Sequence, residues 1–254
     1  MISNLREKAE NESSMDYWYP MVKDHLPCPK TESITLPDDV INTFRKAIYG
    51  RAEKDIIEEN LEAIKEVANR IGYPLFMRSD QGSGKHDWEG TCYVKSEEDL
   101  CQNIFNLFGW HEMAGIMGLS YKSLYFRELL DIEPLFIAFW GNMPIGKERR
   151  VFVRDGKVLC IHPYWEQEAI LSSNKHPLPD DWKQIVADSN NVEDGIEILT
   201  EYGEKFSQLV PGYWSVDFIQ DRFGKWWFID AARGELSWHP EPCEHIIRFE
   251  NSMM

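Results

Sequence analysis

The sequence predicts an α+β protein in which antiparallel hairpins alternate with amphipathic helices. Asp155-Gly156 joins two strand-like runs, and an Asp-Gly turn in that setting is a strong hairpin signal. A second pair of apolar, β-prone runs lies within residues 213–239 and flanks the turn Asp221-Arg-Phe-Gly224. Apolar residues recur at helical spacing over 55–71 and 192–209, so each of these segments is expected to form an amphipathic helix.

Composition narrows the class of protein. With 254 residues, 43% of them hydrophobic, the chain can bury a sizeable core, as one domain of two lobes or as two small domains. A net charge of −16 argues against broad nucleic-acid binding, which needs a basic face. Five cysteines without a Cys-x-x-Cys pair indicate neither a disulfide framework nor a zinc knuckle. No run is long enough to span a membrane, and we expect a soluble, cytoplasmic protein.

The first fifty residues are expected to form a lead-in that packs on the body of the protein. Residues 1–15 are polar and are predicted to be frayed, and four prolines then break any long element. The sequence therefore indicates an extended chain with a short strand near 32–36. A helix should follow over 38–47, with Asp38 or Asp39 as its N-cap residue.

A loop of small residues between two predicted strands is a candidate phosphate-binding element. The strand 73–77 leads into Arg78-Ser-Asp-Gln-Gly-Ser-Gly-Lys85-His-Asp-Trp88, and a strand resumes over 91–94. The backbone N–H groups of such a loop can surround phosphates, while Arg78 and Lys85 supply positive charge. The loop is not a Walker A motif, because no Gly-x-x-x-x-Gly-Lys-Ser/Thr run leads into a helix. An ordinary flexible hairpin loop is the alternative interpretation.

The middle of the chain predicts one more helix and several strands. A helix should begin after Ser96 and run to about Phe108, and a strand should cover 124–130. The continuous apolar run 135–140 predicts a strand that is buried on both faces. Residues 163–190 are expected to be rich in loops.

Two acids in the 213–239 hairpin form a candidate metal site. Asp217 and Asp230 each lie among bulky residues, and two carboxylates on neighbouring strands repel each other unless a cation lies between them. Oxygen ligands from two strands suit Mg²⁺, which keeps its remaining positions for water and phosphate. Glu235, on the turn that follows, is a candidate third ligand. The alternative is a hairpin with two acids that face solvent.

The order of these segments resembles the ATP-grasp superfamily, in particular the cell-division-cycle-123 family and its phage and bacterial relatives. The resemblance covers residues from about 17 to 239. It rests on Trp18-Tyr-Pro20 with Thr31…Leu36-Pro37, Arg78…Ser83-Gly-Lys85-His-Asp87, Glu148-Arg-Arg150-Val-Phe-Val, and Asp217…Ile229-Asp230-x-x-x-Gly234-Glu235. It implies an ATP-grasp fold, in which two α+β lobes with antiparallel sheets clasp ATP between them.

The resemblance also implies roles for individual residues. Arg78 and Lys85 would contact the phosphates, a hinge at 128–130 would pair its backbone with adenine, and Asp131 or Glu133 would hold the ribose. Lys85 and Arg150 would be catalytic, with Arg150 neutralising phosphate or a developing acyl phosphate. The nucleotide-contacting set is Arg78, Ser83, Lys85, Glu128, Leu129, Leu130, Asp131, Glu133 and Arg150, and the Mg²⁺ set is Asp217, Asp230 and Glu235. Ala232 stands where the superfamily usually has an Asn ligand.

The lobes implied by the resemblance can be placed on the chain. The lead-in would occupy 1–50, a small lobe with the phosphate loop 51–126, and a large lobe with the hinge and metal-binding strands 127–254. This arrangement implies an ATP- and Mg²⁺-dependent ligase that activates a carboxylate, or a phosphate, for attack by a nucleophile on an acceptor that the sequence does not identify.

Two other functions fit the resemblance. The cell-division-cycle-123 family is associated with assembly of translation initiation factor 2, so the protein could be a non-enzymatic, ATP-binding assembly chaperone. A third possibility is a ligase that acts on a nucleic-acid end, with the basic residues Arg149, Arg150, Arg154 and Lys157 lining a groove. The charge of −16 makes the nucleic-acid function the less favoured one.

Overall fold

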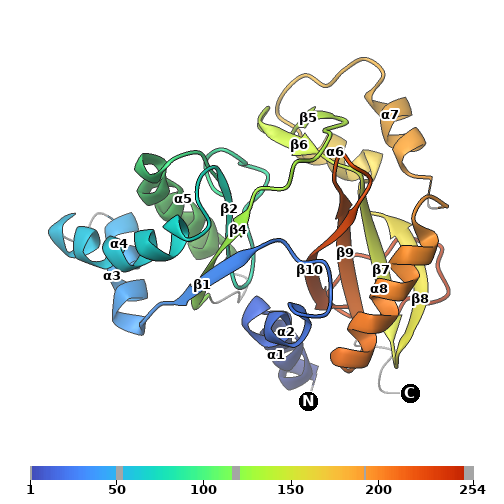
Figure 1. Ribbon diagram of the computed structural model, residues 1–254, viewed down its shortest axis with the longest axis horizontal. Coiled ribbons are helices and arrows are strands. Elements are labelled where there is room, and N and C mark those ends of the chain that lie inside the picture. The colour runs from blue at the N-terminus through green and yellow to red at the C-terminus, as the bar shows by residue number, and fades with distance from the viewer. Residues whose placement is uncertain (1, 50–53, 116–120, 192, 249–254) are drawn as a thin grey trace. The chain divides into compact units, whose positions relative to one another are not determined.

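The computed structural model describes residues 2–49, 54–115, 121–191 and 193–248 (Figure 1). The chain divides into two compact units. The smaller unit consists of Pro29–Leu130 and Phe139–Met143, and the larger unit consists of Met1–Cys28, Asp131–Ala138 and Pro144–Met254. Among the described residues, no helix combines the length and the apolar character that a membrane crossing requires.

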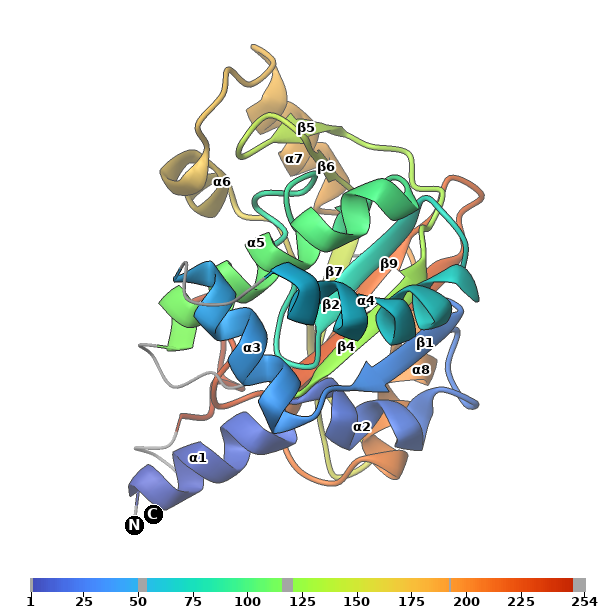
Figure 2. The same ribbon diagram turned by 90° about the vertical axis from the view of Figure 1, so that its left-hand side faces the viewer.

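The smaller unit is an antiparallel sheet that carries three helices on one face. The strand order is β1-β4-β2-β3, and α3, α4 and α5 lie in front of the sheet in Figure 2. Apolar side chains from these helices, such as Phe44 and Leu107, are completely buried with Phe126 and other strand residues. The elements are β1 (Thr31–Thr35), α3 (Asp38–Ile48), α4 (Lys54–Asn69), β2 (Leu75–Ser79), β3 (Tyr93–Val94), α5 (Glu97–Gly115) and β4 (Ser123–Glu128).

The larger unit contains a second antiparallel sheet, of order β10-β9-β7-β8, and a separate two-stranded sheet of β5 and β6. Helix α8 packs across β7, β8 and β9 (Figure 1). The elements are α1 (Ile2–Glu12), α2 (Met15–Val22), β5 (Phe136–Ala138), β6 (Met143–Ile145), β7 (Glu148–Arg154), β8 (Lys157–Pro163), α6 (Gln167–Ser173), α7 (Trp182–Ser189), α8 (Ile196–Leu209), β9 (Trp214–Gln220) and β10 (Trp226–Arg233).

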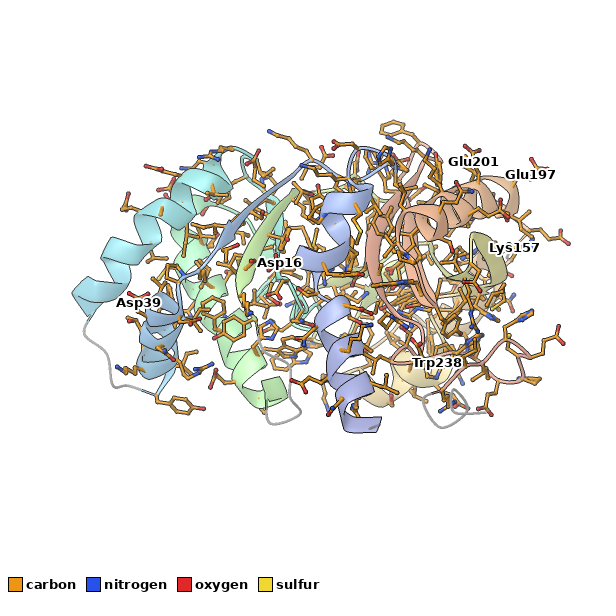
Figure 3. All side chains as sticks on the ribbon, turned by 90° about the horizontal axis from the view of Figure 1, so that it is seen from below. Asp16, Asp39, Lys157, Glu197, Glu201 and Trp238 are labelled. Carbon is orange, nitrogen blue, oxygen red and sulfur yellow. The ribbon has the colours of Figure 1, made fainter. Side chains whose placement is uncertain are left out.

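Helix α8 shows why its sequence pattern forms a helix on this sheet. Leu199, Gly203 and Phe206 are buried at a spacing that places them on one helix face. Glu197 and Glu201 project from α8 into solvent (Figure 3). The helical spacing therefore predicted α8 correctly from residue 196 onward, while the first residue of the predicted segment, Val192, lies outside the described residues.

The N-terminal segment corrects the expectation of a frayed, extended chain. Residues predicted to be frayed form α1, and α2 follows with Pro20 inside it. The Ser14 side chain caps α2 by accepting a hydrogen bond from the Asp16 N–H. Trp18 is completely buried, with its ring 5.2 Å from that of Phe228. Burial of this aromatic face outweighs the hydrogen bond that a proline removes from such a short helix.

Three further expectations were wrong in detail. The N-cap residue of α3 is Pro37, so neither Asp38 nor Asp39 caps it. The run 135–140 is not a strand buried on both faces, because strand β5 is short and Ile137 is 43% exposed. The segment 163–190, expected to be rich in loops, contains α6 and α7. Each of those helices is held by only one or two buried side chains, which is too few for a clear periodic signal.

Candidate functional site

Three candidate residues of the larger unit lie in one row across its sheet. Arg150 on β7 is the register partner of Asp217 on β9, and Asp217 is in turn the partner of Asp230 on β10. Directly opposed residues on neighbouring antiparallel strands present their side chains to the same face, close enough to interact. The fold therefore places one guanidinium and two carboxylates side by side.

Arg150 and Asp217 form a bidentate ion pair. The Arg150 Nε donates to Asp217 Oδ1 and Nη2 donates to Oδ2, both at 2.9 Å. The two side chains are only 16% and 8% exposed. Burial lowers the pKa of the Arg150 guanidinium, but the Asp217 carboxylate and its hydrogen bonds outweigh this and raise the pKa overall. Arg150 therefore stays charged in a partly dehydrated setting.

Two further contacts fix the guanidinium of Arg150. Its Nη1 donates to the Trp238 carbonyl at 3.2 Å, and its Cζ lies 4.8 Å from the ring centroid of Tyr164. The sequence analysis did not single out Tyr164 for this role, since only the fold brings it over Arg150. The position of Arg150 is thus set by strand pairing, a carboxylate, a carbonyl and an aromatic face.

A β-bulge brings Asp230 opposite Asp217. Phe228 pairs with Phe218, but the next pair is Asp230 with Asp217, so Ile229 is the extra residue. The Oδ1 of Asp230 accepts a hydrogen bond from the N–H of Ala231 at 3.0 Å. Each carboxylate has about four lone-pair positions, so both acids can accept these hydrogen bonds and still coordinate a cation. The donor set fits one Mg²⁺ that completes its shell with water and phosphate oxygens.

Glu235 has protein partners of its own. Arg233 donates to it through Nε at 3.2 Å and through Nη2 at 2.8 Å. Arg233 also forms an ion pair with Glu12 of α1. The interaction of Arg233 with Glu12 and Glu235 was not foreseen from the sequence, which carries no signal that α1 would reach β10. Ala232 offers no oxygen from its side chain, so the nearby metal ligand that the superfamily usually has is absent at this position.

The candidate hinge residues follow β4. The N–H of Glu128 donates to the Lys30 carbonyl at 2.9 Å, and its carboxylate accepts from the Lys30 N–H at 2.7 Å. Leu129 and Leu130 are partly buried and lie outside any strand. Asp131 forms an exposed ion pair with Arg222 at 2.8 Å. Glu133 is exposed. These residues are divided between the two units, with Glu128 to Leu130 in the smaller and Asp131 onward in the larger.

The candidate phosphate loop lies between β2 and β3 of the smaller unit and carries Ser83 and Lys85, while Arg78 precedes it on β2. Arg78 is only 5% exposed, and its Nε donates to the Ser79 carbonyl at 3.1 Å. At the start of the loop, Asp80 accepts hydrogen bonds from the N–H groups of residues 122 and 123 at 2.8 and 3.1 Å. This end of the loop is therefore tied to the first residues of β4.

The far end of the loop is tied to α5. The Asn103 amide donates to three carbonyls, those of Glu89 at 3.0 Å, Thr91 at 3.1 Å and Tyr93 at 3.0 Å. Thr91 itself donates to the carbonyls of Gly84 and Asp87 at 3.0 and 2.7 Å. A loop held in this way has a defined backbone course around Lys85.

One of the basic residues proposed to line a nucleic-acid groove is in the core. Arg149 has no exposed surface, and its Nη2 donates to the carbonyls of Ser189 and Asn191 at 2.6 and 2.8 Å. Arg154 forms an exposed ion pair with Asp155 at 3.3 Å. Arg149 therefore cannot contribute to a basic surface groove.

Two α+β units with antiparallel sheets, a phosphate-loop candidate and paired strand acids together define the ATP-grasp class. A comparison with protein families confirms this resemblance. The chain belongs to a family of ATP-grasp domains, numbered 3 within its clade, whose model matches residues 66–249. A comparison with curated proteins gave no match.

Solved structures are similar in fold. The C-terminally truncated Cdc123 of Schizosaccharomyces pombe aligns at a TM-score of 0.59 and 12% identity, over 97% of this chain and 91% of that one. A second Cdc123 structure from the same organism gives 0.58 and 13%, over 97% and 92%. The ATP complex of D-alanine–D-alanine ligase from Bacillus anthracis gives 0.45 and 13%, over 87% and 54%. At these identities the likeness to Cdc123 concerns the fold alone.

Proposed function

We propose that this protein is an ATP- and Mg²⁺-dependent ligase that activates a carboxylate, or a phosphate, for attack by a nucleophile. Membership of the ATP-grasp family implies ATP binding. The observation that carries the proposal is the row of Arg150, Asp217 and Asp230 at paired positions on three strands. One cation and two anions give this row a net negative charge, which favours a bound metal ion.

Asp217 and Asp230 would hold one Mg²⁺ between them. Arg150 would contribute the second positive charge to the phosphates, with its guanidinium already oriented by Asp217, Trp238 and Tyr164. Such preorganisation lowers the cost of stabilising charge that develops during phosphoryl transfer. Since Ala232 supplies no ligand and Glu235 pairs with Arg233, we assign one metal ion to the row rather than two.

The nucleotide contacts are proposed from the remaining candidates. Arg78, Ser83 and Lys85 would bind the phosphates, as a guanidinium, a hydroxyl and an ammonium. We assign adenine to the backbone of Leu129 and Leu130, because the Glu128 N–H already donates to Lys30. When bound, ATP would supply the phosphoryl group that converts the donor carboxylate into an acyl phosphate, which a nucleophile then displaces.

Product analysis tests this proposal. Tag-free protein would be incubated with Mg²⁺-ATP, a mixture of amino acids and dicarboxylic acids as donors, and hydroxylamine as a surrogate nucleophile. We expect ADP and hydroxamate to form together, and both to fall at least about tenfold in Asp230→Asn, which removes a metal ligand. The matched control is Asp155→Asn, an exposed acid in the β7–β8 turn of the same sheet. Equal turnover in Asp230→Asn and wild type would contradict the proposal.

A second function is favoured by a specific observation, the absence of an oxygen ligand at Ala232 together with the engagement of Glu235 by Arg233. A site with fewer metal ligands would bind ATP and turn it over slowly, as an ATP-binding assembly factor for another protein would. The same experiment separates the two functions. Mg²⁺-dependent ATP binding with no ADP formed under any donor mixture would favour the assembly factor.

A further inference from the structure

Four metal-ligating side chains meet in the larger unit, apart from the acidic row. They come from two short runs, Cys160-Ile-His162 on β8 and His239-Pro-Glu-Pro-Cys243 in the C-terminal segment. One ligand atom from each of the four lies within 4.8 Å of the other three. His239 is 5% exposed, and the other three are partly buried. Two runs that are far apart in the chain therefore converge on one point.

We propose that Cys160, His162, His239 and Cys243 form a structural zinc site. Two thiolates and two imidazoles are a typical donor set for a closed, four-coordinate Zn²⁺ site. Zn–S and Zn–N bonds of about 2.3 and 2.0 Å require ligand separations of about 3.3 to 3.8 Å in a tetrahedron. Cys160 Sγ and His239 Nε2 are already 3.4 Å apart. The widest separations in the cluster need to close by about 1 Å, a movement that side-chain torsions can supply.

The surroundings of His239 select the ligating form of its ring. The Tyr213 hydroxyl donates to the His245 carbonyl at 3.2 Å, so its oxygen can accept a hydrogen bond from Nδ1–H of His239 at 3.1 Å. That assignment leaves the lone pair on Nε2, the nitrogen that faces Cys160. Phe152 stacks on the His239 ring with centroids 3.8 Å apart. A hydrogen bond on the distal nitrogen and a packed ring are the usual support of a metal-bound histidine.

His162 provides an independent indication. Its Nε2 is buried and, within the part of the chain that the structure describes, has no hydrogen-bond partner. A buried polar atom without a partner costs free energy, which coordination to a metal ion would recover. The His162 ring lies 5.0 Å from the ring of His239. The cluster therefore contains a nitrogen that the protein alone leaves unsatisfied.

Zinc at this point would tie the C-terminal segment to the sheet. His239 and Cys243 belong to a segment without regular structure, whereas Cys160 and His162 are on β8. Trp238, labelled in Figure 3, precedes His239 and accepts a hydrogen bond from Arg150 through its carbonyl. His162 is also the register partner of Arg150. The site would thus help to position Arg150, without contacting any ligand of the acidic row.

Metal analysis of the intact, tag-free protein tests the proposal. Protein produced with zinc in the medium should carry about one equivalent of Zn²⁺ after dialysis, as expected for a structural site. Exchange with Co²⁺ should give the visible spectrum of a tetrahedral ion and a thiolate-to-cobalt charge-transfer band. Hydrogen exchange in residues 237–248 should become faster when a chelator removes the metal.

Matched variants complete the test. Cys160→Ser/Cys243→Ser should reduce the zinc content at least about tenfold, and Cys101→Ser, on α5 of the smaller unit, should leave it unchanged. Wild-type protein without zinc and without a cobalt charge-transfer band would overturn the proposal, and that result does not depend on the folding of any variant. A peptide map showing a Cys160–Cys243 disulfide, or equal zinc loss in Cys101→Ser, would also overturn it.

Discussion

Arg150 holds Asp217 through two parallel hydrogen bonds of 2.9 Å from the neighbouring strand. The pair is mostly buried, and Asp230 lies opposite Asp217 on the other side. The Arg150–Asp217 pair is neutral in sum, so the additional carboxylate of Asp230 gives the row its negative charge. This arrangement explains how two strand acids can lie side by side in the absence of repulsion strong enough to separate the strands.

The first prediction concerns the free energy of unfolding that this ion pair contributes. Arg150→Gln leaves the buried Asp217 carboxylate without its guanidinium, and we expect a loss of about 3 kcal/mol in urea unfolding. Arg150→Gln/Asp217→Asn removes both charges and should regain at least half of that loss, because a neutral amide pair can still hydrogen-bond. Additive effects of the two substitutions would show that the pair is not coupled.

The second prediction concerns the close approach of α8 to the sheet. A Cβ added at Gly203 would lie 2.8 Å from Val158 and 3.0 Å from Val151, both stiff, branched side chains on strands. Gly203→Ala should therefore destabilise the protein by about 1 to 2 kcal/mol, because overpacking exceeds the gain in helix propensity. The control is Gly109→Ala on α5, where an added Cβ meets nothing within 4 Å. It should stabilise by up to about 1 kcal/mol, and a stabilising Gly203→Ala would contradict the packing described.

The third prediction concerns the pH dependence of stability. His111 is 1% exposed, and burial, assisted by Arg78, lowers its pKa from 6.5 to about 4. The unfolded chain binds a proton below pH 6.5 that the folded chain resists until about pH 4, so stability is lost as the pH falls through this window. At pH 4.5 the loss due to this residue should be roughly 2 to 3 kcal/mol.

His111→Phe provides the comparison for this pH effect. Phenylalanine can keep the ring packing against Tyr121, whose centroid is 4.8 Å from that of His111, and it cannot titrate. The variant should therefore unfold with a shallower pH dependence than wild type between pH 6.5 and about pH 4.5, as measured by urea titration. Parallel pH profiles for the two proteins would show that His111 is not the group responsible.

The fourth prediction concerns the anchor of the phosphate loop. Asn103→Asp replaces the amide that donates to three carbonyls by a carboxylate that cannot donate. We expect a loss of about 3 kcal/mol and faster hydrogen exchange in residues 84–93. Gln102→Glu makes the same chemical change on the exposed side of α5 and should cost only a few tenths of a kcal/mol. Unchanged exchange in Asn103→Asp would contradict the assigned anchor.

The sequence predicted the class of fold because its hairpin turns and amphipathic helices are local signals. The turns at 155–156 and 221–224 both join antiparallel strands, as expected. The relation between Asp217 and Asp230 was less accessible. Counting residues outward from the turn pairs Ile229 with Asp217, and only the bulge at Ile229 brings Asp230 to that position. A bulge is set by packing on the whole sheet, which residue spacing alone does not reveal.

Contacts between distant segments were also hidden from the sequence. Residue types and spacing around Cys160 and Cys243 show two short ligand pairs, but nothing local indicates that β8 and the C-terminal segment meet. The pairing of Glu12 and Glu235 with Arg233 likewise depends on where α1 packs. These interactions belong to tertiary structure, and a sequence pattern identifies the groups without their partners.

The most direct test of the proposed function is calorimetric ATP binding, with and without Mg²⁺, by wild type, Asp230→Asn and the control Asp155→Asn. The account predicts that wild type and Asp155→Asn bind ATP at least about tenfold more tightly with Mg²⁺ than without it. Asp230→Asn should lose that difference, since it removes one of the two carboxylates assigned to the metal ion. Equal affinity in all three proteins, or no dependence on Mg²⁺ in wild type, would contradict the assignment of Asp217 and Asp230 as a magnesium site.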